Sequence, residues 1–439
     1  MTITDMNRRK VLAIAWPIIL SNLSTPLLGL VDTAVIGNLG DASLIGGIAL
    51  GTMIFSFLFW GFGFLRMGTT GLVAQAAGAE NWLESQACFY RALLIGGAIG
   101  SLLILLQSPI ASLSMSLIGG SAEVESAALT YFQIRIWGSP LNLTLLAMMG
   151  YFLGIQDARS VLKVQLTLNG TNIVLDLLLV VGLGWGVAGA ALATVMAEAI
   201  ACLLSLAIIF PGLKRRTGSL IISRNLLLAR NELLRMFAVN RDIMIRTICL
   251  IFGFAWFTNQ GAKSGDLILA ANTILMQFVS FSAFFLDGFA LAAESLVGHA
   301  TGQRERNRLT KVIRLSVELG LYTAGLITLI FILAGSWVIS MLTNVPEVNQ
   351  VADEYFLWVL AAPIVSLWCY LLDGIFIGAT RTVEMRNAML ISLGVYLGSW
   401  YLLQGWDNHG LWAALMVYFV ARAFTLGLYL PRVSRWGES

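Results

Sequence analysis

The chain has 439 residues, of which 58% are hydrophobic and 12% are charged, and its mean hydropathy is +0.82. Soluble proteins carry about 25% charged residues, so this composition excludes a soluble globular domain and predicts a polytopic membrane protein. The formal net charge of +3 comes from basic loops and indicates no nucleic-acid partner.

Twelve hydrophobic segments are long enough to cross a hydrocarbon core of about 30 Å. In chain order they are 11–37, 43–72, 88–110, 123–153, 160–182, 186–211, 236–260, 266–298, 309–337, 349–378, 386–404 and 409–431. A membrane β-strand would need only about 9 to 11 residues with strict alternation, so all twelve are predicted to be helices. The predicted fold class is an all-α polytopic membrane protein with 12 transmembrane helices.

The positive residues support this count, because Lys and Arg stay on the cytoplasmic side and each helix changes the side. Arg8, Arg9 and Lys10 place the N-terminus inside, and every second loop after it is basic, whereas the outward loops carry little besides Lys263. We therefore expect both termini to be cytoplasmic. The first segment lacks a cleavage pattern and is expected to be a retained helix rather than a signal peptide.

The first segment, 11–37, contains one ionisable residue between Val11 and Ile36, which is Asp32. A charged side chain at the centre of a membrane helix costs at least about 2.5 to 3.5 kcal/mol, so such residues are functional by default. Pro26 lies six residues earlier and removes a helix hydrogen bond to Asn22. Our hypothesis is that neutralising Asp32 lets the helix bend at Pro26; the alternative is a static kink.

Four further polar residues of the first half are predicted to share the leaflet of Asp32. Asn172 and Asp176 are spaced i, i+4 on segment 160–182, Thr194 lies on segment 186–211 and Tyr131 on segment 123–153. At 1.5 Å per residue, all lie roughly 8 to 15 Å below the outward helix ends. A buried carboxylate there either takes up a proton or binds a cation such as Na⁺, which uses several oxygens; structural, satisfied aspartates are the alternative.

An internal repeat divides the chain. Leu72–Gly78 recurs as Leu296–Gly302 and Gly150–Gly154 as Gly374–Gly378, each at a shift of 224 residues. Two halves of six helices enter the membrane from the same side, which predicts two lobes related by a pseudo-twofold axis along the membrane normal. This architecture is typical of alternating-access transporters.

The predicted domain limits follow from the repeat and from the basic stretch between its halves. Residues 1–210 form the N-terminal lobe, residues 211–235 a cytoplasmic linker, and residues 236–439 the C-terminal lobe. The C-terminal lobe has no acidic residue at the positions equivalent to Asp32 and Asp176. Its Asp373 is expected to be a structural group neutralised by Arg381, Arg386 or Arg422.

Signals for enzyme chemistry are missing. The two histidines, His299 and His409, are far apart, and the four cysteines are scattered singly without metal spacing. Gly261–Ser264 lacks the first glycine of a phosphate loop. We expect no catalytic residue, no resident metal and no cofactor, with H⁺ or Na⁺ acting only as the coupling ion.

The chain resembles the multidrug and toxic compound extrusion (MATE) transporters, and within them the DinF-like branch. The resemblance rests on Pro26-x₅-Asp32-Thr33-Ala34, on Asn172-x₃-Asp176 and on the stretch Leu372–Arg381. It implies an inner-membrane antiporter that exports small cationic or amphipathic drug-like compounds, driven by inward movement of protons or sodium. In that branch the coupling carboxylates match Asp32 and Asp176.

The resemblance also implies polar partners at Asn172, Thr194 and Tyr131. The NorM-like branch uses an acidic residue on its seventh helix, whereas Ile248–Thr258 has none here, although Asp373 matches an acidic position of that branch. Asp373 is thus a possible acidic site of the C-terminal lobe. We expect the protein to be a monomer. Apart from its transported compounds, its expected partner is membrane lipid.

Three alternatives remain open. A flippase for lipid-linked precursors would favour a basic cavity, and the acidic residues of the first lobe argue against it. An intramembrane transferase would need a convergent nucleophile, base or metal, and a channel fits a duplicated pair of lobes less well.

Overall fold

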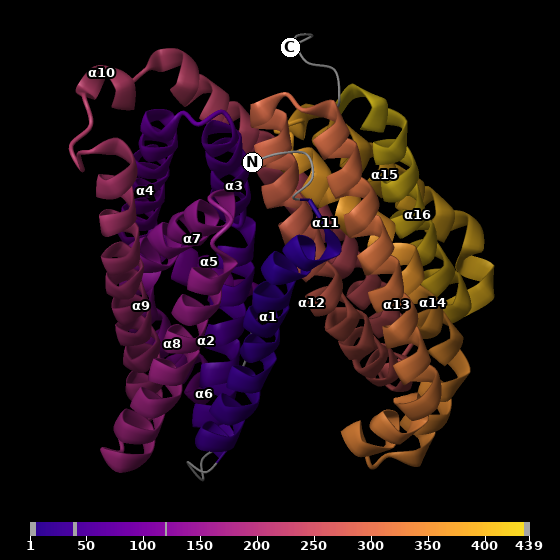
Figure 1. Cartoon of the computed structure of the whole chain (residues 1–439). Coiled ribbons are helices and arrows are strands. Elements are labelled where there is room, and N and C mark those ends of the chain that lie inside the picture. Colours follow the sequence, from indigo (N-terminus) through magenta and orange to yellow (C-terminus); the bar gives the residue numbers. More distant parts are fainter. Residues whose placement is uncertain (1–5, 38–41, 119–120, 434–439) are drawn as a thin grey trace. The chain divides into compact units, whose positions relative to one another are not determined.

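The computed structural model describes residues 6–37, 42–118 and 121–433, and the side chains of 27, 28, 30–36, 42, 117 and 118 lie outside this description. Every regular element in these ranges is a helix (Figure 1). The N-terminal half contains α1 (Arg8–Gly37), α2 (Ala42–Gly61), α3 (Phe64–Gly78), α4 (Trp82–Leu105), α5 (Gln107–Ile118), α6 (Ala122–Arg135), η2 (Ile136–Gly138), α7 (Ser139–Gly154), α8 (Ala158–Asp176), η3 (Leu177–Gly182), α9 (Gly186–Thr217) and α10 (Arg224–Leu227).

The C-terminal half contains fewer and longer helices. They are α11 (Arg230–Lys263), α12 (Asp266–Gln303), α13 (Arg306–Leu342), α14 (Pro346–Gly378), α15 (Thr382–Leu403), η4 (Gln404–Trp406) and α16 (Asp407–Val433). Most of these helices are longer than a bilayer requires, so they tilt or extend beyond the hydrocarbon.

All twelve predicted segments coincide with helices. Within the described ranges, nine helical stretches are long and apolar enough to cross a membrane by length and composition. One of them, Thr382–Val433, holds the two predicted segments of α15 and α16, and α1 and α11 complete the twelve. The prediction of an all-α membrane protein with two six-helix lobes is confirmed.

The chain forms two compact units, which we call the N-terminal unit (Leu20–Phe237) and the C-terminal unit (Met1–Ile19 with Ala238–Ser439). The beginning of α1 therefore belongs to the C-terminal unit. The reason is visible at Gly288 of α12, where a Cβ would lie 2.3 Å from Cγ1 of Ile19. Small residues permit such close helix contacts in membranes.

The repeated glycines have the same packing role in both units. On α7, a Cβ at Gly150 would lie 2.5 Å from the carbonyl oxygen of Arg66 on α3. On α14, a Cβ at Gly374 or Gly378 would lie 2.2 Å from the carbonyl oxygen of Ala290 or Glu294 on α12. The internal repeat thus specifies a backbone contact that only glycine permits.

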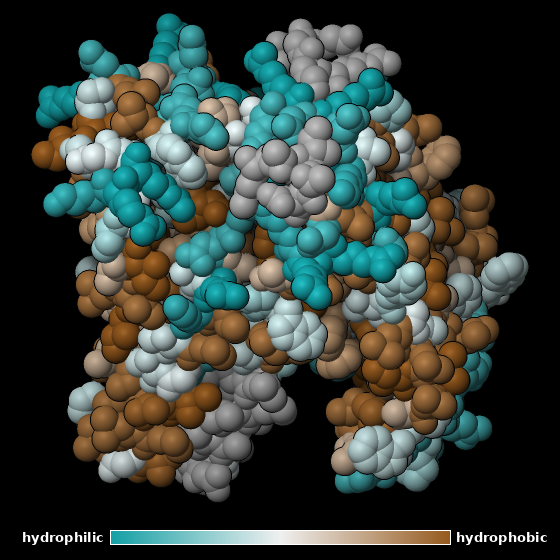
Figure 2. Space-filling model, in the orientation of Figure 1, coloured by the Kyte–Doolittle hydropathy of each residue, from teal (hydrophilic) through white to brown (hydrophobic). Residues whose placement is uncertain are grey.

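The outer surfaces suit a lipid environment. Figure 2 shows hydrophobic residues covering much of the lower part of the N-terminal unit, while hydrophilic residues gather at the end that carries α10. Many large apolar side chains of this unit are exposed, among them Leu105, Leu203 and Val174. Their exposure is expected for side chains in contact with acyl chains.

Candidate functional site

A polar stripe runs along α8 of the N-terminal unit. Nε2 of Gln165 donates to Oδ1 of Asn169 at 3.0 Å, and Nδ2 of Asn172 donates to Oδ2 of Asp176 at 3.0 Å. The positions i, i+4, i+7 and i+11 place these four side chains on one helical face. Asn169, Asn172 and Asp176 are buried. The structure thus brings together Asn172 and Asp176, as their i, i+4 spacing suggested.

This stripe contacts α1 close to Pro26. Nδ2 of Asn169 donates to Oγ of Ser24 at 2.8 Å, and Oγ of Ser24 donates to the carbonyl oxygen of Ser21 at 2.7 Å. Pro26 lies within the continuous helix α1, two residues beyond this contact. Asp32 lies on the same helix, but its side chain is outside the described residues.

A change of helix type follows Asp176 directly. The segment η3 (Leu177–Gly182) is a π-helix, and the amide nitrogen of Leu183 donates to the carbonyl oxygen of Leu178 at 2.9 Å. Such wide turns often occur at functional sites, because the inserted residue shifts the side chains around it. No sequence signal marks this feature, since Leu177–Gly182 is uniformly apolar or small.

Thr194 and Tyr131 lie on helices that pack in the same unit. α9 packs against both α8 and α6. Oγ1 of Thr194 donates to the carbonyl oxygen of Ala190 at 3.1 Å, and the buried ring of Tyr131 lies 6.3 Å from that of Phe55. Both residues remain predicted partners of the coupling site.

A buried ion pair that the sequence did not resolve lies one helical turn from these two residues. The Nη1 and Nη2 atoms of Arg135 donate to Oε2 and Oε1 of Glu198 at 2.9 and 2.5 Å. Nδ2 of Asn142 donates to Oε1 of Glu198 at 2.6 Å. Arg135 follows Tyr131 by four residues on α6, and Glu198 follows Thr194 by four on α9, so each pair shares a helical face.

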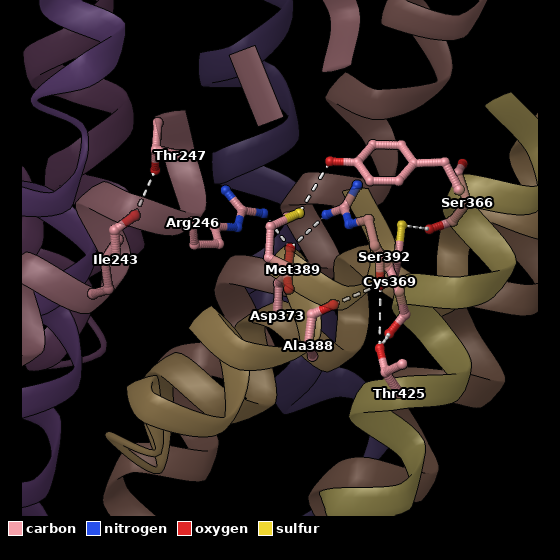
Figure 3. Close-up of polar contacts among 12 residues, drawn as sticks. Ile243, Arg246, Thr247, Ser366, Cys369, Asp373, Ala388, Met389, Ser392 and Thr425 are labelled. Carbon is pink, nitrogen blue, oxygen red and sulfur yellow. Dashed lines mark hydrogen bonds and ion pairs between the residues drawn. The ribbon is translucent and has the colours of Figure 1, made fainter. Parts of the chain in front are cut away.

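Asp373 of the C-terminal unit is held by two arginines (Figure 3). Its Oδ2 accepts from Nη2 of Arg422 on α16 at 2.7 Å and from Nη2 of Arg246 on α11. The expectation of a neutralising Arg422 is confirmed.

The two alternative arginines contact other acidic residues. Nη1 of Arg386 donates to Oδ1 of Asp242 at 2.8 Å, and Arg381 lies 3.9 Å from Glu384. The sequence did not point to Arg246, because 127 residues separate it from Asp373 and only helix packing brings them together.

Comparison with known proteins places these features in a family. The family model described as MatE matches residues 17–178 and 243–399. The DNA damage-inducible protein F of Escherichia coli is 41% identical over 97% of this chain and 92% of its own length. A probable multidrug resistance protein NorM of Thermotoga maritima is 24% identical over 85% of this chain and 80% of its own length.

A solved structure has the same fold. It is described as the outward-facing conformation of a multidrug resistance MATE family transporter of the MOP superfamily. Its TM-score is 0.87 at 18% identity, and the match covers 98% of this chain and 97% of that chain.

Proposed function

Because the chain belongs to the MatE family of membrane transporters, we propose that it is a secondary antiporter that exports small cationic or amphipathic compounds. Inward movement of protons drives the export, with Na⁺ as the alternative ion. The protein works as a monomer in a bacterial cytoplasmic membrane with both termini inside, and alternating access moves the substrate.

The observation that carries this proposal is the polar stripe of α8 and its contact with α1. Asp32 lies eight residues beyond Ser24, and Asp176 lies seven residues beyond Asn169, the partner of Ser24. The predicted segments 11–37 and 160–182, which correspond to α1 and α8, both run outward in the predicted topology. At 1.5 Å per residue, the two aspartates lie about 12 Å and about 10 Å beyond the contact, at a common depth.

Carboxylates at this depth suit coupling to an ion. Protonation removes one negative charge and turns one carboxylate oxygen into an O–H donor, so the Asn172 contact with Asp176 is weakened. The negative form can attract a cationic substrate, and the neutral form releases it. Asp32 and Asp176 therefore exchange proton for substrate, while Asn172, Thr194 and Tyr131 supply neutral polar groups, or oxygen ligands if the ion is Na⁺.

Pro26 gives α1 a point at which it can respond. A proline within a helix removes one backbone hydrogen bond and weakens the turn before it. The Ser24 contact fixes α1 to α8 just before that point. Neutralisation of Asp32 beyond the proline bends the outer part of α1 and narrows the binding region of the N-terminal unit.

The test is efflux of a fluorescent cationic dye from proteoliposomes under an imposed pH gradient and, separately, a Na⁺ gradient. We expect Asp32→Asn and Asp176→Asn to reduce proton-driven efflux at least about tenfold, because they cannot change charge. Asp353→Asn is the matched control, because Asp353 is exposed on α14. Undiminished efflux by both variants under both gradients would refute coupling at these carboxylates.

A further inference from the structure

Two buried guanidinium groups meet one carboxylate in the C-terminal unit. The side chains of Arg246 and Asp373 are each 7% exposed, and that of Arg422 is 1% exposed. The three residues come from α11, α14 and α16 and converge at one point (Figure 3). The three groups that are in direct contact carry two positive charges and one negative charge.

The cluster has more hydrogen-bond donors than its carboxylate uses. Nε of Arg246 and both Nε and Nη1 of Arg422 are buried and have no hydrogen-bond partner among the described residues. Buried donors are nearly always satisfied in folded proteins, and an unmet donor costs about 1 to 3 kcal/mol. The three nitrogens therefore indicate an acceptor beyond Asp373.

The surroundings fix the orientation of Arg422. Its guanidinium carbon lies 5.5 Å from the ring centroid of Tyr418, at a distance typical of cation–π contact. The hydroxyl of Tyr418 donates to Sδ of Met389 at 3.0 Å, and its ring stacks on Tyr396 at 5.1 Å. The donors are thus held in place before any ligand arrives, which lowers the entropic cost of binding.

Another acidic residue, Asp287 of α12, acts electrostatically on Cys369 and Tyr370 and has an interaction of its own. The thiol beside the cluster does not supply the missing acceptor, because Sγ of Cys369 donates to the carbonyl oxygen of Ser366 at 3.0 Å. The excess of donors around Asp373 remains after these neighbours are considered.

We propose that Arg246 and Arg422 bind the anionic group of a small molecule, of the carboxylate class, beside Asp373. Guanidinium groups are planar donors whose geometry matches carboxylates, and Asp373 already shows how a carboxylate sits between them. Asp373 acts as the resident counterion, and the ligand takes the remaining donors. This site lies in the C-terminal unit and does not depend on which ion drives transport.

A purely structural ion cluster predicts the opposite response to one substitution. Asp373→Asn keeps the shape of the side chain, weakens its hydrogen bonds to the two Nη2 donors and adds one unit of positive charge. An anion site then binds its ligand more tightly, whereas a structural cluster only loses stability. Misfolding cannot produce a gain in affinity, so this variant separates the two explanations.

The experiment is calorimetric titration of the purified full chain in detergent with sodium benzoate, and with sodium chloride at the same ionic strength. We expect benzoate to bind more tightly than chloride. Relative to wild type, Asp373→Asn should lower the Kd of benzoate at least about tenfold and Arg422→Gln should raise it at least about tenfold, as expected for charge-assisted hydrogen bonds.

The matched control is Arg241→Gln, which removes an exposed guanidinium from the same helix, α11, and should leave the Kd within about twofold. The proposal is overturned if benzoate binds no tighter than chloride, or if Asp373→Asn leaves its affinity unchanged or weaker. If Asp373→Asn does not fold, equal affinities of wild type, Arg422→Gln and Arg241→Gln for benzoate overturn it as well.

Discussion

At the scale of single residues, the buried Arg135–Glu198 pair shows how a charge is made tolerable inside a membrane protein. Glu198 accepts three hydrogen bonds, and the Arg135 guanidinium lies over the rings of Phe55 and Phe59 at 5.3 and 5.1 Å. Gly138 makes room for this arrangement. Its position just after α6 allows the two charged groups to meet without a side chain between them.

We predict that Gly138→Ala destabilises the protein by about 1 to 3 kcal/mol, as expected for overpacking. The added Cβ would lie 2.5 Å from Nη1 of Arg135 and 2.9 Å from Oε2 of Glu198. The measurement is thermal unfolding in detergent. Gly170→Ala is the control, because a Cβ there meets nothing within 4 Å, and an equal loss of stability in both variants would contradict the prediction.

At the scale of elements, α10 and the residues just before it are bound to α4. Nε2 of Gln86 donates to the carbonyl oxygen of Ser219 at 3.0 Å. The hydroxyl of Tyr90 donates to the carbonyl oxygen of Leu220 at 2.9 Å. Arg91, which is buried, donates from Nε and Nη2 to the carbonyl oxygens of Leu227 and Leu226 at 3.0 and 2.6 Å. These bonds hold α10 and the chain before it on the N-terminal unit.

We predict that Arg91→Ala releases this segment, because two hydrogen bonds from one charged group are lost together, each worth about 1.5 to 3 kcal/mol. Limited digestion with proteinase K should cleave within residues 218–229 at least about fivefold faster than in the wild type, because local opening controls cleavage. The control is Arg159→Ala, which removes an exposed positive charge. Equal cleavage of Arg91→Ala and wild type would show that other contacts hold this segment.

At the scale of the whole molecule, the repeat has kept the backbone contacts and changed the chemistry. The glycines of α7 and α14 pack alike, yet α8 has a polar stripe ending in Asp176, whereas Asp373 is paired with two arginines. The two units are therefore expected to have different functions, with ion coupling in the N-terminal unit.

This division predicts different transport phenotypes for matched substitutions. Asp373→Asn should keep proton-driven dye efflux within about threefold of wild type, whereas Asp176→Asn should reduce it at least about tenfold, because a permanently neutral side chain cannot cycle between charge states. Both are measured in the same proteoliposomes at equal protein content. A comparable loss in Asp373→Asn would place coupling chemistry in the C-terminal unit as well.

The amino-acid order was sufficient to predict a membrane protein of twelve helices in two related halves, because hydrophobic length, loop charge and repeated glycines are local properties of the chain. It also predicted that Asn172 and Asp176 share one helical face, which depends only on the pitch of one helix, and the structure adds the hydrogen bond between them. The roles of Asp32, Thr194 and Tyr131 stay predictions. The pairing of Arg246 with Asp373 and of Arg135 with Glu198 required the folded structure, because these partners are 127 and 63 residues apart and their contact depends on how whole helices pack.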